Sequence, residues 1–402
     1  MLPKNKPMKN QNGQIIFALL VVLFIALIIF SNLWLINKFN RKLILSAKKE
    51  ANSERIVYDI VKSSSDFPEE SISSKFKVDD YFYSVKTEKH FFLTILSLEV
   101  KTKNSDSCYR FFWGQDVPSA VKNSFIEFAD SPYKLRIDTA STLINGSVVV
   151  KNTPCSEFLK IKKVTSLYFN DRKIVGLLDM IKSFKKSSTS QDFSEILSFS
   201  ESERKILGPG VLNSKSPLFI KGEFKNKVLI YNFCQIKAPE IYIENAECSG
   251  LVLLAKKVNL QNVEGDIQII AQKEIVLENS ILKNPSVVVF DGTEGKVVIR
   301  NSRISGSVLI IPSEKENVKL NTVVENAMFK GVGIFKTGVL LKKKNTFSGA
   351  FQFDYVYYYA NGMPVYNKLK GISLLPLKEK VIVPFSLVSK GGRKNAIFVF
   401  KE

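Results

Sequence analysis

The sequence predicts a mainly β protein with an N-terminal transmembrane helix, a small β-rich (or α+β) middle domain and a C-terminal parallel β-helix, or solenoid. Three observations predict this: a long apolar run near the N-terminus, short β-branched and aromatic runs in the middle, and a repeat of about 20 residues in the C-terminal half. The expected parts are a short basic leader (1–13), the transmembrane helix (14–36), a helical extension (37–65), the β-rich domain (66–165), a helical connector (166–206), the β-helix (207–375) and C-terminal cap strands (376–402).

The transmembrane helix is predicted by the 22 residues from Ile15 to Ile36, which are apolar apart from Ser31 and Asn32. This length spans a hydrocarbon core, and Trp34 near one end suits the headgroup zone. A cleaved secretory signal has a shorter apolar region of about 7–15 residues. We therefore expect a retained, single-pass anchor.

A specific resemblance starts at Asn12-Gly13, which directly precedes Gln14 and the apolar run. A short basic leader that ends in glycine before an apolar helix with an amphipathic extension resembles the N-terminus of type IV pilins and pseudopilins. The resemblance implies leader processing between Gly13 and Gln14 and packing of the helix among like helices. One departure is Ala18, which stands where most pilins have a glutamate, as in some minor pilins. An ordinary signal anchor is the alternative.

The pilin-like interpretation implies a bacterial inner-membrane protein with its body extracytoplasmic. Three lysines precede the apolar run, and five basic residues follow it between residues 37 and 49. The positive-inside rule applied to these flanks favours a cytoplasmic body instead. Both orientations therefore stay open.

The middle of the chain carries short runs rich in aromatic and β-branched residues, at 81–85, 91–96, 133–138 and 146–150. Helical spacing from Ile174 to Phe184, and again at 196–199, predicts the connector. Cys108 and Cys155 fall in the middle domain, whereas Cys234 and Cys248 fall in the β-helix. This distribution permits one disulfide per domain if the body is exported. Four cysteines allow three connectivities, so the pairing is open.

The β-helix is predicted by short alternating apolar runs that recur from residue 217 onward. The equivalent positions are expected to be Ile243, Leu260, Leu277, Ile299, Leu320 and Leu341, with spacings of 17, 17, 22, 21 and 21 residues. A second strand opens after Gly250, Gly265, Pro285, Gly306, Gly331 and Gly349. Asn or Gly at the corners tolerates a left-handed backbone, and stacked Asn side chains can form an amide ladder. An antiparallel meander would favour repeated Asn-Gly turns, but only Asn361-Gly362 occurs.

The pattern of short apolar strands separated by glycine in residues 217–353 also resembles that of bactofilins, the polymer-forming β-helix proteins. This resemblance implies a second interpretation, a membrane-tethered scaffold that self-associates through its β-helix.

Enzymatic chemistry is not supported by the residue types present. The only histidine, His90, lies between Lys89 and Phe91 and is predicted to be a surface or edge residue. A multi-histidine metal centre within one chain is therefore excluded, and neither CxxC nor a Cys/His cluster occurs. The carboxylates Asp266, Asp291 and Glu294 fall at different corners, and no acidic cluster accompanies Arg300 or Arg303, so neither hydrolase nor lyase chemistry is expected. We expect no cofactor and no metal.

Alternation places Phe351, Phe353, Tyr355, Tyr357 and Tyr359 on one face of a strand. Such a strip either closes the last rung as a cap or binds sugar rings or a partner surface. The charge balance of 58 Lys+Arg against 38 Asp+Glu gives +20, but no motif that reads DNA or RNA accompanies it. We expect no nucleic-acid partner, and Lys342, Lys343 and Lys344 are expected to form a solvated edge.

The function predicted from these features is that of a non-enzymatic, single-span envelope protein with a structural or assembly role, such as a minor-pilin-like component of a pilus or secretion filament. The alternatives are the bactofilin-like scaffold and a surface β-helix that binds or cleaves polysaccharide. The expected partners are the membrane and either other pilin-like subunits or further copies of the β-helix.

Overall fold

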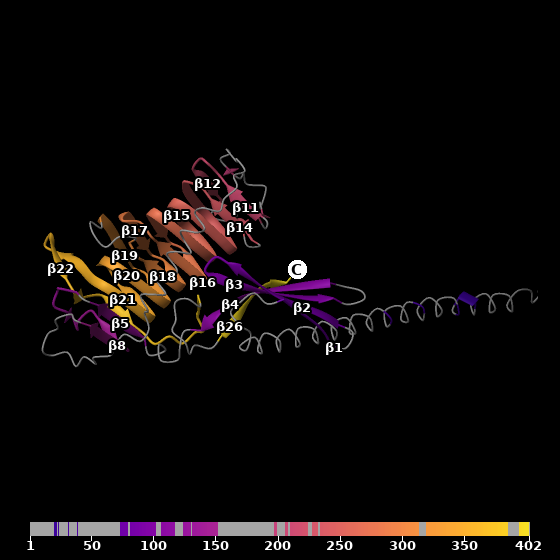
Figure 1. The fold of residues 1–402 in the computed structure, drawn as a ribbon, viewed down its shortest axis with the longest axis horizontal. Helices are drawn as coiled ribbons and strands as arrows, with labels where there is room; N and C mark the ends of the chain where they lie inside the picture. Colours follow the sequence, from indigo (N-terminus) through magenta and orange to yellow (C-terminus); the bar gives the residue numbers. More distant parts are fainter. Residues whose placement is uncertain are drawn as a thin grey trace, which may run out of the picture. The chain divides into compact units, whose positions relative to one another are not determined.

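The computed structural model describes residues 73–78, 81–101, 106–116, 124–129, 131–151, 197–198, 206–207, 210–223, 227–231, 234–312, 319–384 and 394–401, with five single positions nearer the N-terminus. The chain forms two compact units, Met1–Lys62 and Ser63–Glu402. The second unit is mainly β and contains a parallel β-solenoid of about seven turns (Figure 1), so the predicted solenoid is confirmed.

In the first unit, the five described residues are helical: Leu20, Val21, Leu23, Ser31 and Lys38. Otherwise the leader, the predicted transmembrane helix (14–36) and the extension (37–65) lie outside the described residues, as do Gly13 and Gln14. No helix in the part of the chain that the structure describes is long and apolar enough to cross a membrane. The anchor and the leader processing therefore stay predictions.

The solenoid is built from two parallel ladders. One ladder joins β15 (Glu240–Glu278), β16 (Ile281–Phe290), β18 (Arg303–Ile310), β20 (Met328–Lys342) and β21 (Asn345–Ala360). The other joins β15, β17 (Glu294–Arg300), β19 (Lys319–Glu325) and the ends of β20 and β21. Each strand is thus hydrogen-bonded to the coil before it and the coil after it.

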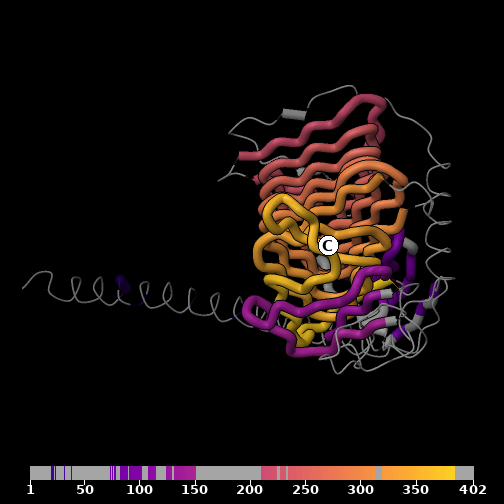
Figure 2. Tube along the Cα trace, turned by 90° about the vertical axis from the view of Figure 1, so that its left-hand side faces the viewer, coloured from indigo at the N-terminus to yellow at the C-terminus, as the bar shows by residue number. Residues whose placement is uncertain are grey.

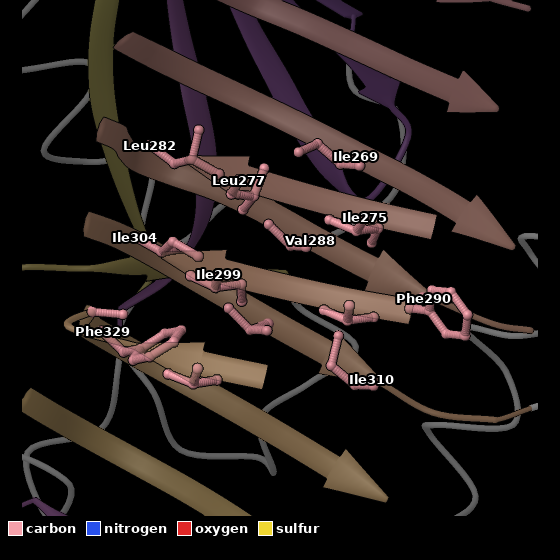
Figure 3. Packing of buried hydrophobic residues seen from close by; sticks show 14 of the residues in the cluster. Ile269, Ile275, Leu277, Leu282, Val288, Phe290, Ile299, Ile304, Ile310 and Phe329 are labelled. Atoms are coloured by element: carbon pink, nitrogen blue, oxygen red, sulfur yellow. The ribbon is translucent and has the colours of Figure 1, made fainter. Parts of the chain in front are cut away.

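The core consists of columns of side chains, one from each coil (Figure 3). Leu282 pairs with Ile304 and Ile304 with Phe329, while Leu277 pairs with Ile299 in the facing ladder. All five side chains are at most 1% exposed. Because these inward positions alternate with outward ones, a single coil has almost no core of its own and is stabilised by stacking on its neighbours.

The predicted asparagine corners are confirmed. Asn245, Asn262, Asn279, Asn301 and Asn326 all adopt φ between 49° and 54°, in the left-handed region. The Asn262 Nδ2 donates to Asn245 Oδ1 at 3.1 Å, and Asn326 Nδ2 donates to Asn301 Oδ1 at 3.0 Å. The amide ladder is therefore seen as two pairs of successive corners, in each of which one amide side chain donates to the other.

One predicted equivalence is wrong. Ile299 pairs with Val324, and Val324 pairs with Leu341, so Leu320 is not the rung position expected. Leu320 instead pairs with Gly295 at the start of the same strand pair. The corners on either side of this coil, Asn301 and Asn326, are 25 residues apart, so the coil is longer than its neighbours and the apolar pattern alone misplaces its register by four residues.

The middle domain is not a single unit as predicted for 66–165. Its first part forms an antiparallel sheet of β1 (Ser73–Val78), β2 (Tyr81–His90), β3 (Leu93–Lys101) and β4 (Asp106–Asp116). The strands β25 (Ile382–Val383) and β26 (Lys394–Lys401) pair with β4 and complete this sheet. The predicted cap strands (376–402) therefore belong to the antiparallel sheet and do not cap the solenoid.

The second part, residues 124–151, continues the solenoid at its C-terminal end (Figure 2). Strand β5 (Phe125–Ala129) pairs in parallel with β21, and β8 (Ser147–Lys151) pairs with β5. Two shorter strands, β6 (Arg136–Ile137) and β7 (Leu143–Ile144), pair with β23 (Lys368–Leu369) and β24 (Ile372–Leu374). The last coil would expose its core, and this segment covers it: the Phe128 ring stacks on that of Phe353 at 6.1 Å.

The described ends of the predicted connector (166–206) are strands. Leu197–Ser198 (β9) pairs in parallel with β12 (Leu218–Lys221), where a second short helix is predicted. Ile206–Leu207 (β10) pairs with β13 (Val228–Ile230). Pairing with the first coil outweighs the weak helical spacing at 196–199, and residues 166–196 lie outside the described residues.

Candidate functional site

An outer face of the solenoid is covered by other described parts of the chain. The β2–β3 hairpin tip, Phe91 and Phe92, packs with Leu93, Ile95 and Phe112 against outward aliphatic residues of β15, β16, β18 and β20. Leu377, Val381 and Val383 cover the same face. This face is an internal interface and is not available to a ligand.

His90 lies in this interface, so its prediction as a surface or edge residue is wrong. Its Nε2 donates to the Gly250 carbonyl at 3.1 Å, and burial lowers the pKa of His90 to about 4. Phe92 N donates to Gln268 Oε1 at 3.1 Å, and Gln268 Nε2 donates back to the His90 carbonyl at 3.0 Å. The neutral imidazole therefore helps to hold the hairpin on the solenoid.

Asp266 is bound to the same glycine from the other side. Its Oδ2 accepts the Gly250 N–H at 2.5 Å, and burial raises the pKa of Asp266 to about 6. Glu294 begins β17 and pairs in register with Lys319, at a different corner from Asp266. The described residues contain no group of three or more His, Cys, Asp or Glu side chains placed to hold a metal ion. These carboxylates do not form a shared acid–base site.

A second outer face, the open face, is a parallel sheet made by residues 274–278 of β15 together with β17, β19 and the ends of β20 and β21. Its middle column runs in register through Val276, Val298, Val323, Leu340 and Tyr357. The four aliphatic members are 6–8% exposed and form a cluster separate from the solenoid core. Charged side chains flank this column on both sides.

The charges of the open face are paired from coil to coil. Lys296 Nζ lies 3.1 Å from Glu274 Oε1 on one side of the column. On the other side Arg300 bonds both Glu278 (2.7 Å) and Glu325 (3.1 Å). A hydrogen bond from Lys343, with Arg300 nearby, lowers the pKa of Glu325. The lowered pKa keeps Glu325 ionised, which suits it to joining coils and not to proton transfer.

The predicted aromatic strip is divided into two parts. Phe351 and Phe353 point into the core and are 1% exposed, whereas Tyr355, Tyr357 and Tyr359 lie on the open face. The β20–β21 register shifts between Phe335 and Gly338, the positions opposite Phe353 and Tyr355, so the strand turns a corner there. The simple alternation that places all five on one face is wrong because it ignores that corner.

The three outward tyrosines join two others in a tyrosine cluster. The ring centroids of Tyr355 and Tyr357 are 6.3 Å apart, and those of Tyr357 and Tyr359 are 6.0 Å apart. Tyr366 pairs across the predicted Asn361-Gly362 hairpin with Tyr357, and Tyr133 stacks on Tyr366 at 4.2 Å. Burial raises the pKa of both Tyr355 and Tyr357, so their hydroxyls stay protonated as hydrogen-bond donors.

Tyr366 could have been found from the sequence, because a two-residue Asn-Gly turn sets the hairpin register that places it opposite Tyr357. Tyr133 carries no such signal, since it comes from a segment more than 200 residues earlier in the chain.

Beside the tyrosine cluster lies an open groove of about 350 Å³, here called the lysine groove. It is lined by Ser141, Leu340, Leu341, Lys342, Lys343, Tyr358, Tyr359, Lys370 and Gly371. Lys370 Nζ lies 5.1 Å from the centre of the Tyr358 ring. Lys343 Nζ bonds Glu325 at 2.8 Å. The predicted solvated lysine edge therefore forms one wall of a concave surface, and Lys370, which sequence reasoning missed, forms another.

The two cysteines of the solenoid, Cys234 and Cys248, test one of the two predicted disulfides. Cys234 and Cys248 are buried, free thiols, so the disulfide considered for the solenoid is not formed in this structure. Burial raises the pKa of Cys234 to about 11 and that of Cys248 well above its usual value, which makes both thiols unreactive. Cys108 lies in β4, and Cys155 lies outside the described residues.

Comparison of the chain with protein-family models, curated proteins and solved structures found no match. The pilin-like and bactofilin-like resemblances therefore rest on the residues quoted for them.

Proposed function

We propose that this chain is a non-enzymatic, single-span envelope protein in which the solenoid is a rigid body carried by the N-terminal helix. The observation that carries the proposal is the open face, where Glu274, Glu278 and Glu325 are each engaged by Lys296, Arg300 or Lys343 between coils. An extended face whose charges join neighbouring coils contributes stiffness, and it offers no paired acid and base for hydrolysis.

In the finer proposal the chain is a minor-pilin-like subunit that assembles through residues 14–36. The support is the Gly13–Gln14 junction before the apolar run. The edge of β21 is already paired with β5 and β24, so a second solenoid stacking at this end would meet the five-residue β8 instead of the 16-residue β21. This arrangement favours assembly through the N-terminal helix over the bactofilin-like alternative.

Two measurements on native membranes test the proposal. Mass spectrometry should find a mature N-terminus at Gln14, and Gly13→Val should block that processing whereas the control Asn12→Ala should not. Protease added to intact spheroplasts should digest the solenoid body. An intact leader in the wild type would refute the pilin-like assignment, and a protected body would place the protein with cytoplasmic scaffolds.

A further inference from the structure

The lysine groove combines two features that are not explained by the solenoid's own stability. It is concave, and its volume of about 350 Å³ falls within the range of small-ligand sites. Three lysines, Lys342, Lys343 and Lys370, contribute to its lining. Such a surface attracts anions, because like charges gathered in a hollow raise the local potential.

The positive charge of the groove is only partly compensated. Lys343 bonds Glu325, but that carboxylate is shared with Arg300. Among the described residues, no carboxylate forms an ion pair with Lys342 or Lys370. Elsewhere on the open face Lys296 and Arg300 each meet a carboxylate of a neighbouring coil: Lys296 pairs with Glu274, and Arg300 pairs with Glu278 and Glu325. The lysine groove therefore has more positive than negative side chains, unlike the rest of the open face.

Aromatic rings line the groove beside these charges. Tyr358 and Tyr359 both contribute to its wall, and Tyr359 is 56% exposed although it is a large aromatic side chain. Tyr359 also contacts Tyr357, which connects the groove to the tyrosine cluster. Tyrosine offers an apolar ring face and a hydroxyl donor together, which suits the C–H face and the hydroxyl groups of a sugar.

We propose that the lysine groove binds an acidic saccharide, with its carboxylate or sulfate groups against Lys342 and Lys370 and a sugar ring against Tyr359. A nucleic acid is the less favoured occupant. The rings of Tyr355, Tyr357 and Tyr359 meet at angles of 38° and 81°, so they do not form parallel platforms for successive bases.

The test uses the full chain in detergent and titrates polygalacturonate, with fully methyl-esterified polygalacturonate as the uncharged control ligand. We expect calorimetric binding of the acidic polymer that weakens with salt, and no measurable binding of the ester. Lys342→Gln combined with Lys370→Gln should weaken binding by about tenfold or more, as expected for the loss of two charge-assisted contacts. Tyr359→Ala should also weaken it.

The matched control replaces two exposed lysines outside the groove, Lys344→Gln with Lys378→Gln, and changes the net charge by the same amount. Its affinity should stay within about twofold of the wild type. Equal losses in the two double variants would show diffuse charge attraction and overturn the site. Unchanged affinity in the groove variant would do the same, and tighter binding of oligothymidylate than of polygalacturonate would assign the groove to nucleic acid.

Discussion

Gly331 tests whether the close approach of successive coils sets the solenoid's stability. It lies in a stack, pairing with Gly306 in the preceding coil and Gly349 in the following one, and its φ is +125°. A Cβ added at this position would lie 2.1 Å from the Gly306 carbonyl oxygen and 3.0 Å from Val381 Cγ1. In Gly331→Ala the new Cβ therefore clashes with the backbone of Gly306, which cannot rotate away as a flexible side chain could.

The expected cost has two parts. The left-handed backbone costs a residue with a Cβ about 1–2 kcal/mol. The clash is about 1 Å closer than contact allows, and relieving it in a packed β-stack costs about 1–3 kcal/mol more. The sum of about 2–5 kcal/mol is a large share of the stability of an ordinary domain. A body of this size should lose about 2 °C of melting temperature per kcal/mol, or roughly 4–10 °C in all.

Gly362→Ala is the matched control. Gly362 also has a positive φ, +78°, but nothing lies within 4 Å of an added Cβ. It should show only the backbone cost of about 1–2 kcal/mol. Thermal unfolding of both variants, followed by the far-ultraviolet circular dichroism of the β-structure, makes the comparison. Equal shifts for the two variants would refute the argument that glycine is required by coil-to-coil contact.

Three further predictions follow from particular contacts. The pKa of His90 falls from 6.5 to about 4 on folding, so this residue contributes stability of about 3 kcal/mol that is present above pH 6.5 and lost as the pH drops through 4. The pKa of Asp266 rises from 3.8 to about 6, so its contribution has the opposite sense: it is present below pH 3.8 and lost as the pH rises through 6. His90→Gln removes the His90 contribution and leaves that of Asp266, so the melting temperature of the variant relative to the wild type should rise as the pH falls from 6.5 to 4; a constant difference across this window would contradict a neutral imidazole at this position. Asn326→Ala should lower the melting temperature more than Asn326→Gly, because both lose the bond to Asn301 but only alanine strains the corner at φ +50°; the reverse order would argue against a left-handed corner. In the native chain, iodoacetamide labelling read by mass spectrometry should spare Cys234 and Cys248 and modify both after denaturation, whereas native labelling of either would contradict their burial.

The sequence predicts the solenoid repeat, its asparagine corners and the Asn361-Gly362 turn, because each depends on residues close together in one coil. Inward alternation, left-handed Asn245 or Asn301 and the Asn361-Gly362 turn are local requirements that restrict residue type directly. The register of Val324 could not be read in this way, since a longer coil shifts the pattern without leaving a local mark.

The candidate site was only partly predictable for the same reason. Alternation along one strand predicts that Tyr355, Tyr357 and Tyr359 lie together, but it does not predict the corner that separates Phe351 and Phe353 from them. The lysine groove needs Lys342 from one coil and Lys370 from the segment after the hairpin, and neither residue alone predicts a hollow.

The sequence by itself determined that the chain contains a parallel solenoid, and its single histidine excludes a multi-histidine metal site within one chain. Only the tertiary structure decided how the coil stack is closed and covered. Phe128 reaches Phe353, and Phe92 reaches Gln268, across 225 and 176 residues of sequence. The physical reason is that a solenoid's end and outer faces present general apolar surface. Many short apolar runs could cover such surface, and which of them does so depends on the packing of the whole chain.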